Sequence, residues 1–131
     1  MLITKGKNFR GAYLKGANLE GANLRGAVFY RANLAHANLA GATLERAALY
    51  AANLERASLL GADLAEANLA HANLQEAGFE GAFLAGANLA EANLEGANLE
   101  GACLEGAKIT EEQLAVTVGS PHTGIEPGQE K

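Results

Sequence analysis

Apolar and polar positions follow one another along this chain in a strict period of five residues. An alanine stands at every fifth position from Ala12 to Ala107, 20 times in succession. Two positions after each alanine comes a large apolar residue, which is leucine in 17 cases and phenylalanine or isoleucine in the other three. A strict short period is typical of a solenoid, in which each unit contacts only its neighbours. The repeat therefore predicts one elongated domain over residues 11–110.

The length of the period excludes the two ordinary ways of building a core. Five residues of an α-helix advance 500°, so successive leucines would wind around the helix and form no apolar stripe. Side chains of a flat strand alternate, so an odd period would send successive leucines to opposite faces. A coil that turns a quarter circle per unit points every leucine inward. Four units then complete a coil of 20 residues, which places residues i and i+20 one above another at about 4.8 Å.

The remaining positions of the unit agree with such a coil. Glycine holds the corner position in 11 of 20 units, as turns that need a positive φ require. Asparagine or aspartate precedes the large apolar residue in 11 of 20 units. Its side chain can bond either the local backbone or its own copy one coil away, and the sequence leaves both arrangements open.

The units resemble those of pentapeptide-repeat proteins. Ala-Asn-Leu-Glu-Gly at 17–21 and 92–96 and Ala-Asp-Leu-Ala-Glu at 62–66 are similar to the A-(D/N)-L-x-x repeat of that family. The resemblance implies an all-β solenoid, namely a right-handed quadrilateral β-helix, here of about five coils. Departures at the second position of the unit, such as Tyr13 and Phe83, affect only local turns and the surface.

Both ends of the repeat predict caps. Residues 1–10 contain a truncated first unit and form an N-terminal cap. Thr110 is followed by two glutamates and by Gln113, which is the signature of a helix start, so 111–118 is expected to form a short helical cap. Residues 119–131 have turn-forming composition and predict a flexible tail, either mobile or docked along one face through Ile125.

Charge is divided unevenly between the two halves of the chain. Residues 1–60 carry 8 basic and 3 acidic side chains, net +5, whereas 61–131 carry 2 and 12, net −10. The single Cys103 forms no internal disulfide, and residues 1–7 hold no apolar stretch suited to a signal peptide or membrane span. We therefore expect a protein of the bacterial cytoplasm.

Stacking at i+20 gathers one strip of exposed apolar and aromatic residues. It consists of Val28, Tyr30, Ala48 and Tyr50 and is bordered by Arg10 and Arg31. The candidate interface comprises these four residues and Arg31. Tyrosine beside arginine is typical of protein interfaces. The alternative is an aromatic ladder that only reinforces adjacent coils.

No combination of residues predicts catalysis, a metal or a cofactor. His36 and His71 stand in different columns and His122 in the tail, so no two histidines have metal-ligand spacing. Cys103 has no histidine in its column or beside it, which disfavours an activated nucleophile. Two glutamate pairs stack at i+20, but they lie on a convex surface with no enclosing loop, so a solvated surface is expected rather than acid–base chemistry. These pairs are Glu80 with Glu100 and Glu91 with Glu111.

The sequence favours a non-enzymatic scaffold or protein-binding module with no small-molecule substrate and no membrane contact. The family resemblance implies a rival, a DNA mimic that binds DNA gyrase or topoisomerase, but the basic N-terminal half and the scattered glutamates disfavour it. Nucleic-acid binding is disfavoured because the basic residues fall on different sides of the coil. The expected state is a monomer or a dimer joined end to end at like ends.

Overall fold

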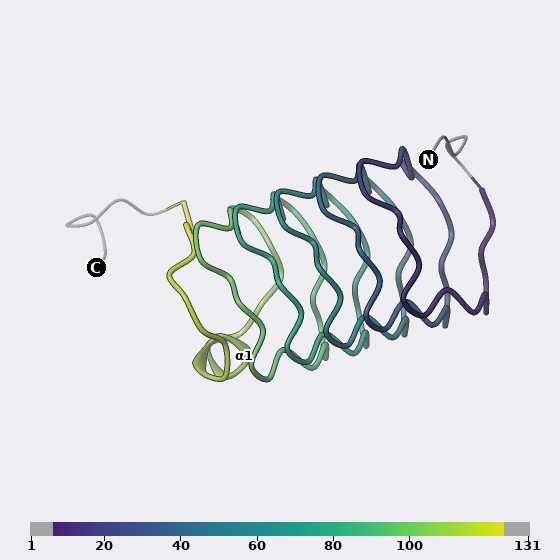
Figure 1. Ribbon diagram of the computed structural model, residues 1–131. Helices are drawn as coiled ribbons and strands as arrows, with labels where there is room; N and C mark the ends of the chain where they lie inside the picture. The colour runs from purple at the N-terminus through teal and green to yellow at the C-terminus, as the bar shows by residue number, and fades with distance from the viewer. Residues whose placement is uncertain (1–6, 125–131) are drawn as a thin grey trace.

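A computed structural model shows the chain as a rod of stacked coils and describes residues 7–124 (Figure 1). Parallel β-bridges join residues 20 apart, beginning with Asn8 and Val28 and continuing to Asn88 and Lys108. The predicted register is therefore confirmed. Within the described range the pairing takes the form of isolated bridges rather than continuous strands, because each straight side of the coil is only a few residues long.

Backbone hydrogen bonds of two kinds hold each unit. Between coils, the Leu34 N–H donates to the Asn53 carbonyl at 2.7 Å, and the Asn53 N–H donates to the Ala32 carbonyl at 2.9 Å. Within the corner, the Ala37 N–H donates to the Leu34 carbonyl at 3.0 Å. The same pattern recurs along the rod, so the backbone groups of the inner coils are paired as burial requires.

The centre of the rod is filled by the alanine and leucine columns. Leu64 has no exposed surface, and the described residues include no buried polar or charged side chain. At the N-terminal end the rings of Phe9 and Phe29 stack 5.0 Å apart at an interplanar angle of 13°. The two aromatic residues stand 20 residues apart, so they belong to one inner column and lie together near the base of the rod.

Every corner of the coil has a residue with positive φ. Eleven corner positions are glycine, which adopts this conformation without strain. A positive φ at the third residue of a turn closed by an i to i+3 hydrogen bond is the mark of a type II turn. Nine corners hold other residues, with φ between 56° and 61°, and these are Arg31, His36, Arg46, Ala51, Arg56, Glu66, His71, Glu76 and Glu91.

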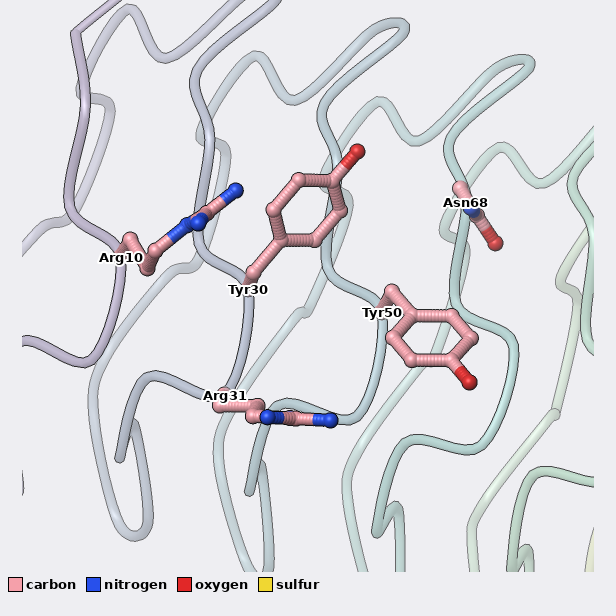
Figure 2. A pocket seen from close by; sticks show the side chains of 5 residues that line it. All are labelled: Arg10, Tyr30, Arg31, Tyr50 and Asn68. Carbon is pink, nitrogen blue, oxygen red and sulfur yellow. The ribbon is translucent and has the colours of Figure 1, made fainter.

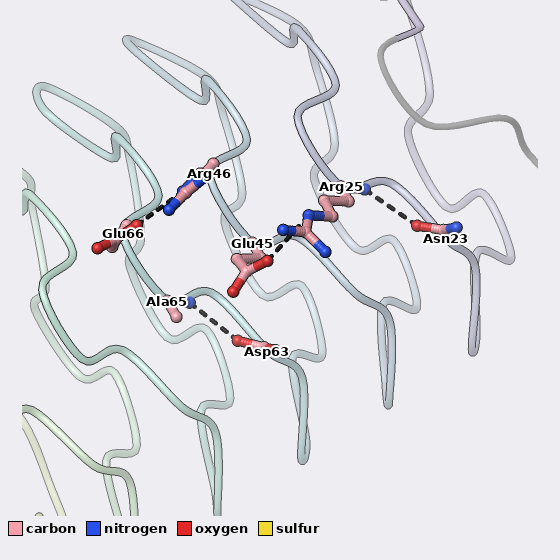
Figure 3. Close-up of polar contacts among 7 residues, drawn as sticks. All are labelled: Asn23, Arg25, Glu45, Arg46, Asp63, Ala65 and Glu66. Carbon is pink, nitrogen blue, oxygen red and sulfur yellow. Dashed lines mark hydrogen bonds and ion pairs between the residues drawn. The ribbon is translucent and has the colours of Figure 1, made fainter.

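The asparagine side chains bond the local backbone. The Arg25 N–H donates to Asn23 Oδ1 at 3.3 Å, and the Ala65 N–H donates to Asp63 Oδ1 at 3.0 Å (Figure 3). In each of the remaining repeat asparagines, Oδ1 accepts the same hydrogen bond from the backbone N–H two residues later. Of the two arrangements that the sequence left open, the structure adopts the local one.

The C-terminal end begins with helix α1, Glu111–Ala115. Thr110 caps it as predicted: the Gln113 N–H donates to Thr110 Oγ1 at 3.1 Å, and the Thr110 N–H donates to Gln113 Oε1 at 2.9 Å. Gln113 Nε2 also donates to the carbonyls of Leu89 and Ala92, at 2.6 and 3.0 Å. The Gln113 side chain thereby replaces the backbone N–H that a further regular unit would donate to the Ala92 carbonyl.

Beyond α1 the chain pairs with the last coil again. Val118 forms a parallel bridge with Asn98, and the Leu104 N–H donates to the His122 carbonyl at 2.6 Å. The paired backbone therefore extends past residue 118, where we expected a flexible tail to begin. Ile125, through which the tail was expected to dock, lies outside the described residues.

Candidate protein-binding site on one face of the rod

The structure places the predicted interface residues on one face of the rod. Val28 and Ala48 pair by a parallel bridge. Tyr30 and Tyr50 follow two residues later in each coil, and their rings contact each other. A pocket of about 410 Å³ opens on this face, and the residues that line it are Arg10, Tyr30, Arg31, Tyr50 and Asn68 (Figure 2). Three of the five predicted residues thus border one pocket, whereas Val28 and Ala48 lie beside it.

The aromatic rings of the pocket contact one another edge to face. The ring centroids of Tyr30 and Tyr50 are 6.3 Å apart at 82°, and the Arg10 guanidinium carbon lies 5.2 Å from the centre of the Tyr30 ring. Edge-to-face rings and a cation over a ring are both attractive arrangements. These contacts hold Tyr30 partly buried and leave Tyr50 38% exposed.

Sequence reasoning missed two members of this surface. Asn68 lines the pocket, and the His71 ring lies 5.3 Å from the Tyr50 ring at 58°. Asn68 is one coil beyond Ala48, so extending the i+20 column would have found it. His71 stands at the corner next to the tyrosine column, which a search for aromatic pairs within single columns overlooks.

Three arginines outside this pocket pair with glutamates exactly one coil later. Arg46 Nε and Glu66 Oε1 lie 2.7 Å apart, as do the same atoms of Arg56 and Glu76. Arg25 Nε makes the equivalent contact with Glu45 at 2.9 Å (Figure 3). The hydrogen bond to the glutamate, and then its negative charge, raises the pKa of the Arg46 and Arg56 guanidiniums above the ordinary value.

A second pocket of about 540 Å³ lies where the last coil meets α1. Its lining combines two glutamates with one lysine and otherwise consists of small, apolar or neutral polar residues: Ala90, Glu91, Ala92, Lys108, Ile109, Thr110, Glu112 and Gln113. Across residues 7–124, no group of three His, Cys, Asp or Glu side chains is arranged to hold a metal ion.

The surroundings of Cys103 differ from the prediction. The sequence placed no histidine in its column or beside it, but the structure pairs Cys103 with His122 by a parallel bridge. The prediction was wrong because the register shifts by one residue near Pro121. A regular corner would place Thr123 opposite Cys103, but the corner between Ser120 and His122 is one residue shorter.

The stacked glutamates make structural contacts at the surface. Glu80 Oε2 accepts from Asn98 Nδ2 at 3.3 Å, and Glu100 Oε1 accepts from the Ser120 N–H at 3.1 Å. Glu111 belongs to α1, so the column that it shares with Glu91 changes conformation at that point. These contacts agree with the expectation of a solvated surface.

The repeat itself identifies the family. A sequence model of the pentapeptide repeats matches residues 8–46, 47–84 and 72–110, which together make up most of the chain. The chain belongs to the pentapeptide-repeat family. A search of the curated proteins finds no match to this sequence.

Several solved pentapeptide-repeat structures are similar to this chain. HetL, which is involved in heterocyst differentiation regulation in the cyanobacterium Nostoc sp. strain PCC 7120, is 27% identical, with 98% of this chain and 78% of HetL covered and a TM-score of 0.47. A pentapeptide repeat protein of the Arabidopsis thaliana thylakoid lumen is 24% identical over 98% and 83% of the chains, with a TM-score of 0.46. QnrB1, a plasmid-mediated fluoroquinolone resistance protein, is 16% identical over 88% and 67%, with a TM-score of 0.45. In the described part of the chain, no helix has the length and apolar character needed to span a membrane.

Proposed function

We propose that this protein is a non-enzymatic scaffold that binds a partner protein through the face formed by Tyr30, Arg31 and Tyr50. The observation that supports this proposal is the coincidence of the predicted aromatic strip with the 410 Å³ pocket. Tyrosine and arginine are enriched at protein interfaces because they combine a large contact area with polar groups at the tip. Their position on a rigid coil lowers the cost of ordering side chains on binding.

The finer features of the fold and its setting belong to the same proposal. The family resemblance implies a right-handed coil with about five turns in the 11–110 repeat. We further propose a bacterial cytoplasmic setting and a monomer or a dimer joined end to end. A binding role without chemistry agrees with a surface whose carboxylates serve as ion-pair and hydrogen-bond partners.

The proposal is tested with the double variant Tyr30→Glu, Tyr50→Glu. Tyr50 is exposed and Tyr30 is partly exposed, so the variant is expected to fold with an unchanged circular dichroism spectrum. A protein recovered with the wild type from its native host is identified by mass spectrometry, purified and titrated directly. We expect its affinity for the variant to fall at least tenfold, about 1.4 kcal/mol.

The matched control changes two exposed apolar residues elsewhere on the rod. Leu60 and Phe83 are each 54% exposed and lie outside the pocket, so Leu60→Glu, Phe83→Glu adds the same two charges. The control is expected to bind the purified partner as the wild type does. Equal binding by both double variants would return the tyrosine strip to the role of an aromatic ladder between coils.

A further inference from the structure

The arginines of this protein divide into two groups. Arg25, Arg46 and Arg56 each contact a glutamate one coil later. Among residues 7–124, Arg10 and Arg31 have no such ion pair, because the positions one coil later are Tyr30 and Ala51. Both unpaired arginines line the 410 Å³ pocket.

The pocket also lacks an acidic side chain of its own. Its lining consists of two arginines, two tyrosines and one asparagine. In the column of Arg31 the first carboxylate is that of Glu91, three coils away, at roughly 14 Å by the spacing of paired strands. That distance exceeds a Debye length at physiological ionic strength, so Glu91 does little to neutralise Arg31.

We propose that this pocket binds carboxylate side chains of an acidic segment in the partner protein, an inference that rests on the proposed function. The Arg31 guanidinium has five N–H donors and no glutamate partner one coil later. It is therefore suited to a bidentate contact with one carboxylate from outside. Arg10, held over the Tyr30 ring, faces the same space and adds a second positive charge (Figure 2). The exposed part of the Tyr50 ring offers an apolar surface beside these charges.

The charge of the whole rod restricts where such a segment can bind. Residues 61–131 carry 12 of the 15 acidic side chains and repel it, whereas the net charge of residues 1–60 is +5. Arg25, Arg46 and Arg56 are already neutralised by glutamates. The pocket is therefore the place in the described structure where guanidinium groups are free to meet carboxylates from outside.

The test measures binding of a capped heptapeptide with three glutamates around one leucine, by NMR titration of the arginine and tyrosine side-chain signals. We expect saturable shifts at Arg10, Arg31 and Tyr50 and a dissociation constant that rises with added salt. The variant Arg10→Gln, Arg31→Gln is expected to raise that constant at least tenfold. Arg10→Lys, Arg31→Lys is expected to restore part of the affinity, because it keeps the charge and loses the planar guanidinium.

The matched control is Arg25→Gln, Arg56→Gln, which removes the same number of positive charges from paired arginines on other columns. It is expected to bind the glutamate peptide within twofold of the wild type. Equal losses in both glutamine variants, or equal binding of a peptide with glutamine in place of glutamate, would overturn the proposal. Tighter binding of a single-stranded DNA decamer at the same residues would assign the pocket to phosphates instead.

The two proposals can fail separately. If the peptide does not bind but the purified partner still requires Tyr30 and Tyr50, the face is an interface and its ligand is not acidic. If the peptide binds but the partner ignores the tyrosine variant, the pocket is a carboxylate site outside the main interface. Concentration-dependent sedimentation that disappears in the Arg10→Gln, Arg31→Gln variant would identify the acidic half of a second copy as the occupant.

Discussion

At the scale of single residues, the position within the unit determines how much a side chain matters. The large apolar residue of each inner unit has almost no contact with solvent, whereas the residue after it is partly or fully exposed in most units. Leu64 and Ala65 illustrate the contrast, since they are adjacent in the chain and Leu64 is fully buried whereas Ala65 is partly exposed. The register can therefore be tested with a pair of neighbouring substitutions.

We expect Leu64→Lys to lower the free energy of unfolding by several kcal/mol, because a charge enters a column without polar partners. Ala65→Lys is expected to change it by less than about 0.5 kcal/mol. Urea denaturation followed by circular dichroism measures both values. Equal midpoints for the two variants would contradict the register.

Glycines with a positive φ differ in what surrounds them. A Cβ added at Gly61 would meet nothing within 4 Å, whereas one at Gly119 would lie 2.5 Å from the Glu100 nitrogen and 2.8 Å from Asn98 Oδ1. Both glycines have positive φ, 63° and 86°, so alanine would strain the backbone at either position. Only at Gly119 would it also clash with neighbouring atoms.

We expect Gly61→Ala to cost about 1 kcal/mol, because the penalty of a left-handed alanine is only partly offset by the lower conformational entropy of the unfolded chain. Gly119→Ala should instead detach the segment around Val118 and His122. Hydrogen exchange at the Leu99, Gly101 and Leu104 N–H groups measures this, because they donate to that segment. Unchanged protection of the three amides in Gly119→Ala would mean that the close contact is relieved without unpairing.

At the scale of elements, sequence and structure agree where local chemistry determines the outcome. Thr110 and Gln113 are three residues apart, so the capping box and the start of α1 could be predicted from the sequence. The five-residue period likewise predicted the stacking of coils. The hydrogen bonds from Gln113 to Leu89 and Ala92 depend on how α1 sits over the last coil, which no local pattern specifies.

The candidate site shows the same division. The tyrosine columns followed directly from i+20 stacking, and so did the absence of a glutamate one coil after Arg31. The pairing of Cys103 with His122 could not be predicted, because it depends on a corner one residue shorter than the repeat. A register change of this kind is decided by backbone pairing across coils rather than by the residues of the corner.

Truncation after Ile109 tests whether α1 and the following segment prevent end-to-end association. It removes Gln113, which donates a hydrogen bond to the Ala92 carbonyl, and Val118, which pairs with Asn98. The last coil is thus left with an open parallel edge. Basic residues dominate one end of the rod and acidic residues the other, which favours head-to-tail stacking. We expect light scattering to show concentration-dependent oligomers that weaken with added salt.

The full chain serves as the reference and should stay a small, discrete species over the same concentrations. Gln113→Ala is an intermediate case, since it keeps the chain length and removes two hydrogen bonds to the last coil. It is expected to destabilise α1 by about 1–3 kcal/mol without forming long assemblies. A truncated protein that remains monomeric throughout would show that the C-terminal segment is not the cap.

At the scale of the whole molecule, the distribution of charge argues against imitation of duplex DNA. A DNA mimic presents a continuous acidic surface along its length, as the two phosphate backbones do. Here the N-terminal half is net basic, and several glutamates are engaged with arginines one coil away. Other glutamates contact Asn98 or the Ser120 backbone on another side of the rod.

We therefore expect this protein neither to inhibit DNA gyrase nor to protect it from a quinolone at micromolar concentrations. The measurement is the supercoiling of relaxed plasmid by purified gyrase, with and without the drug, as the protein is titrated. The Leu64→Lys variant controls for effects of an acidic chain that do not require an intact core, because it keeps the acidic side chains and destabilises the core. Dose-dependent inhibition or protection by the wild type alone would mean that a folded acidic surface reaches the enzyme. The face built from Tyr30, Arg31 and Tyr50 would then no longer be the leading candidate for recognition.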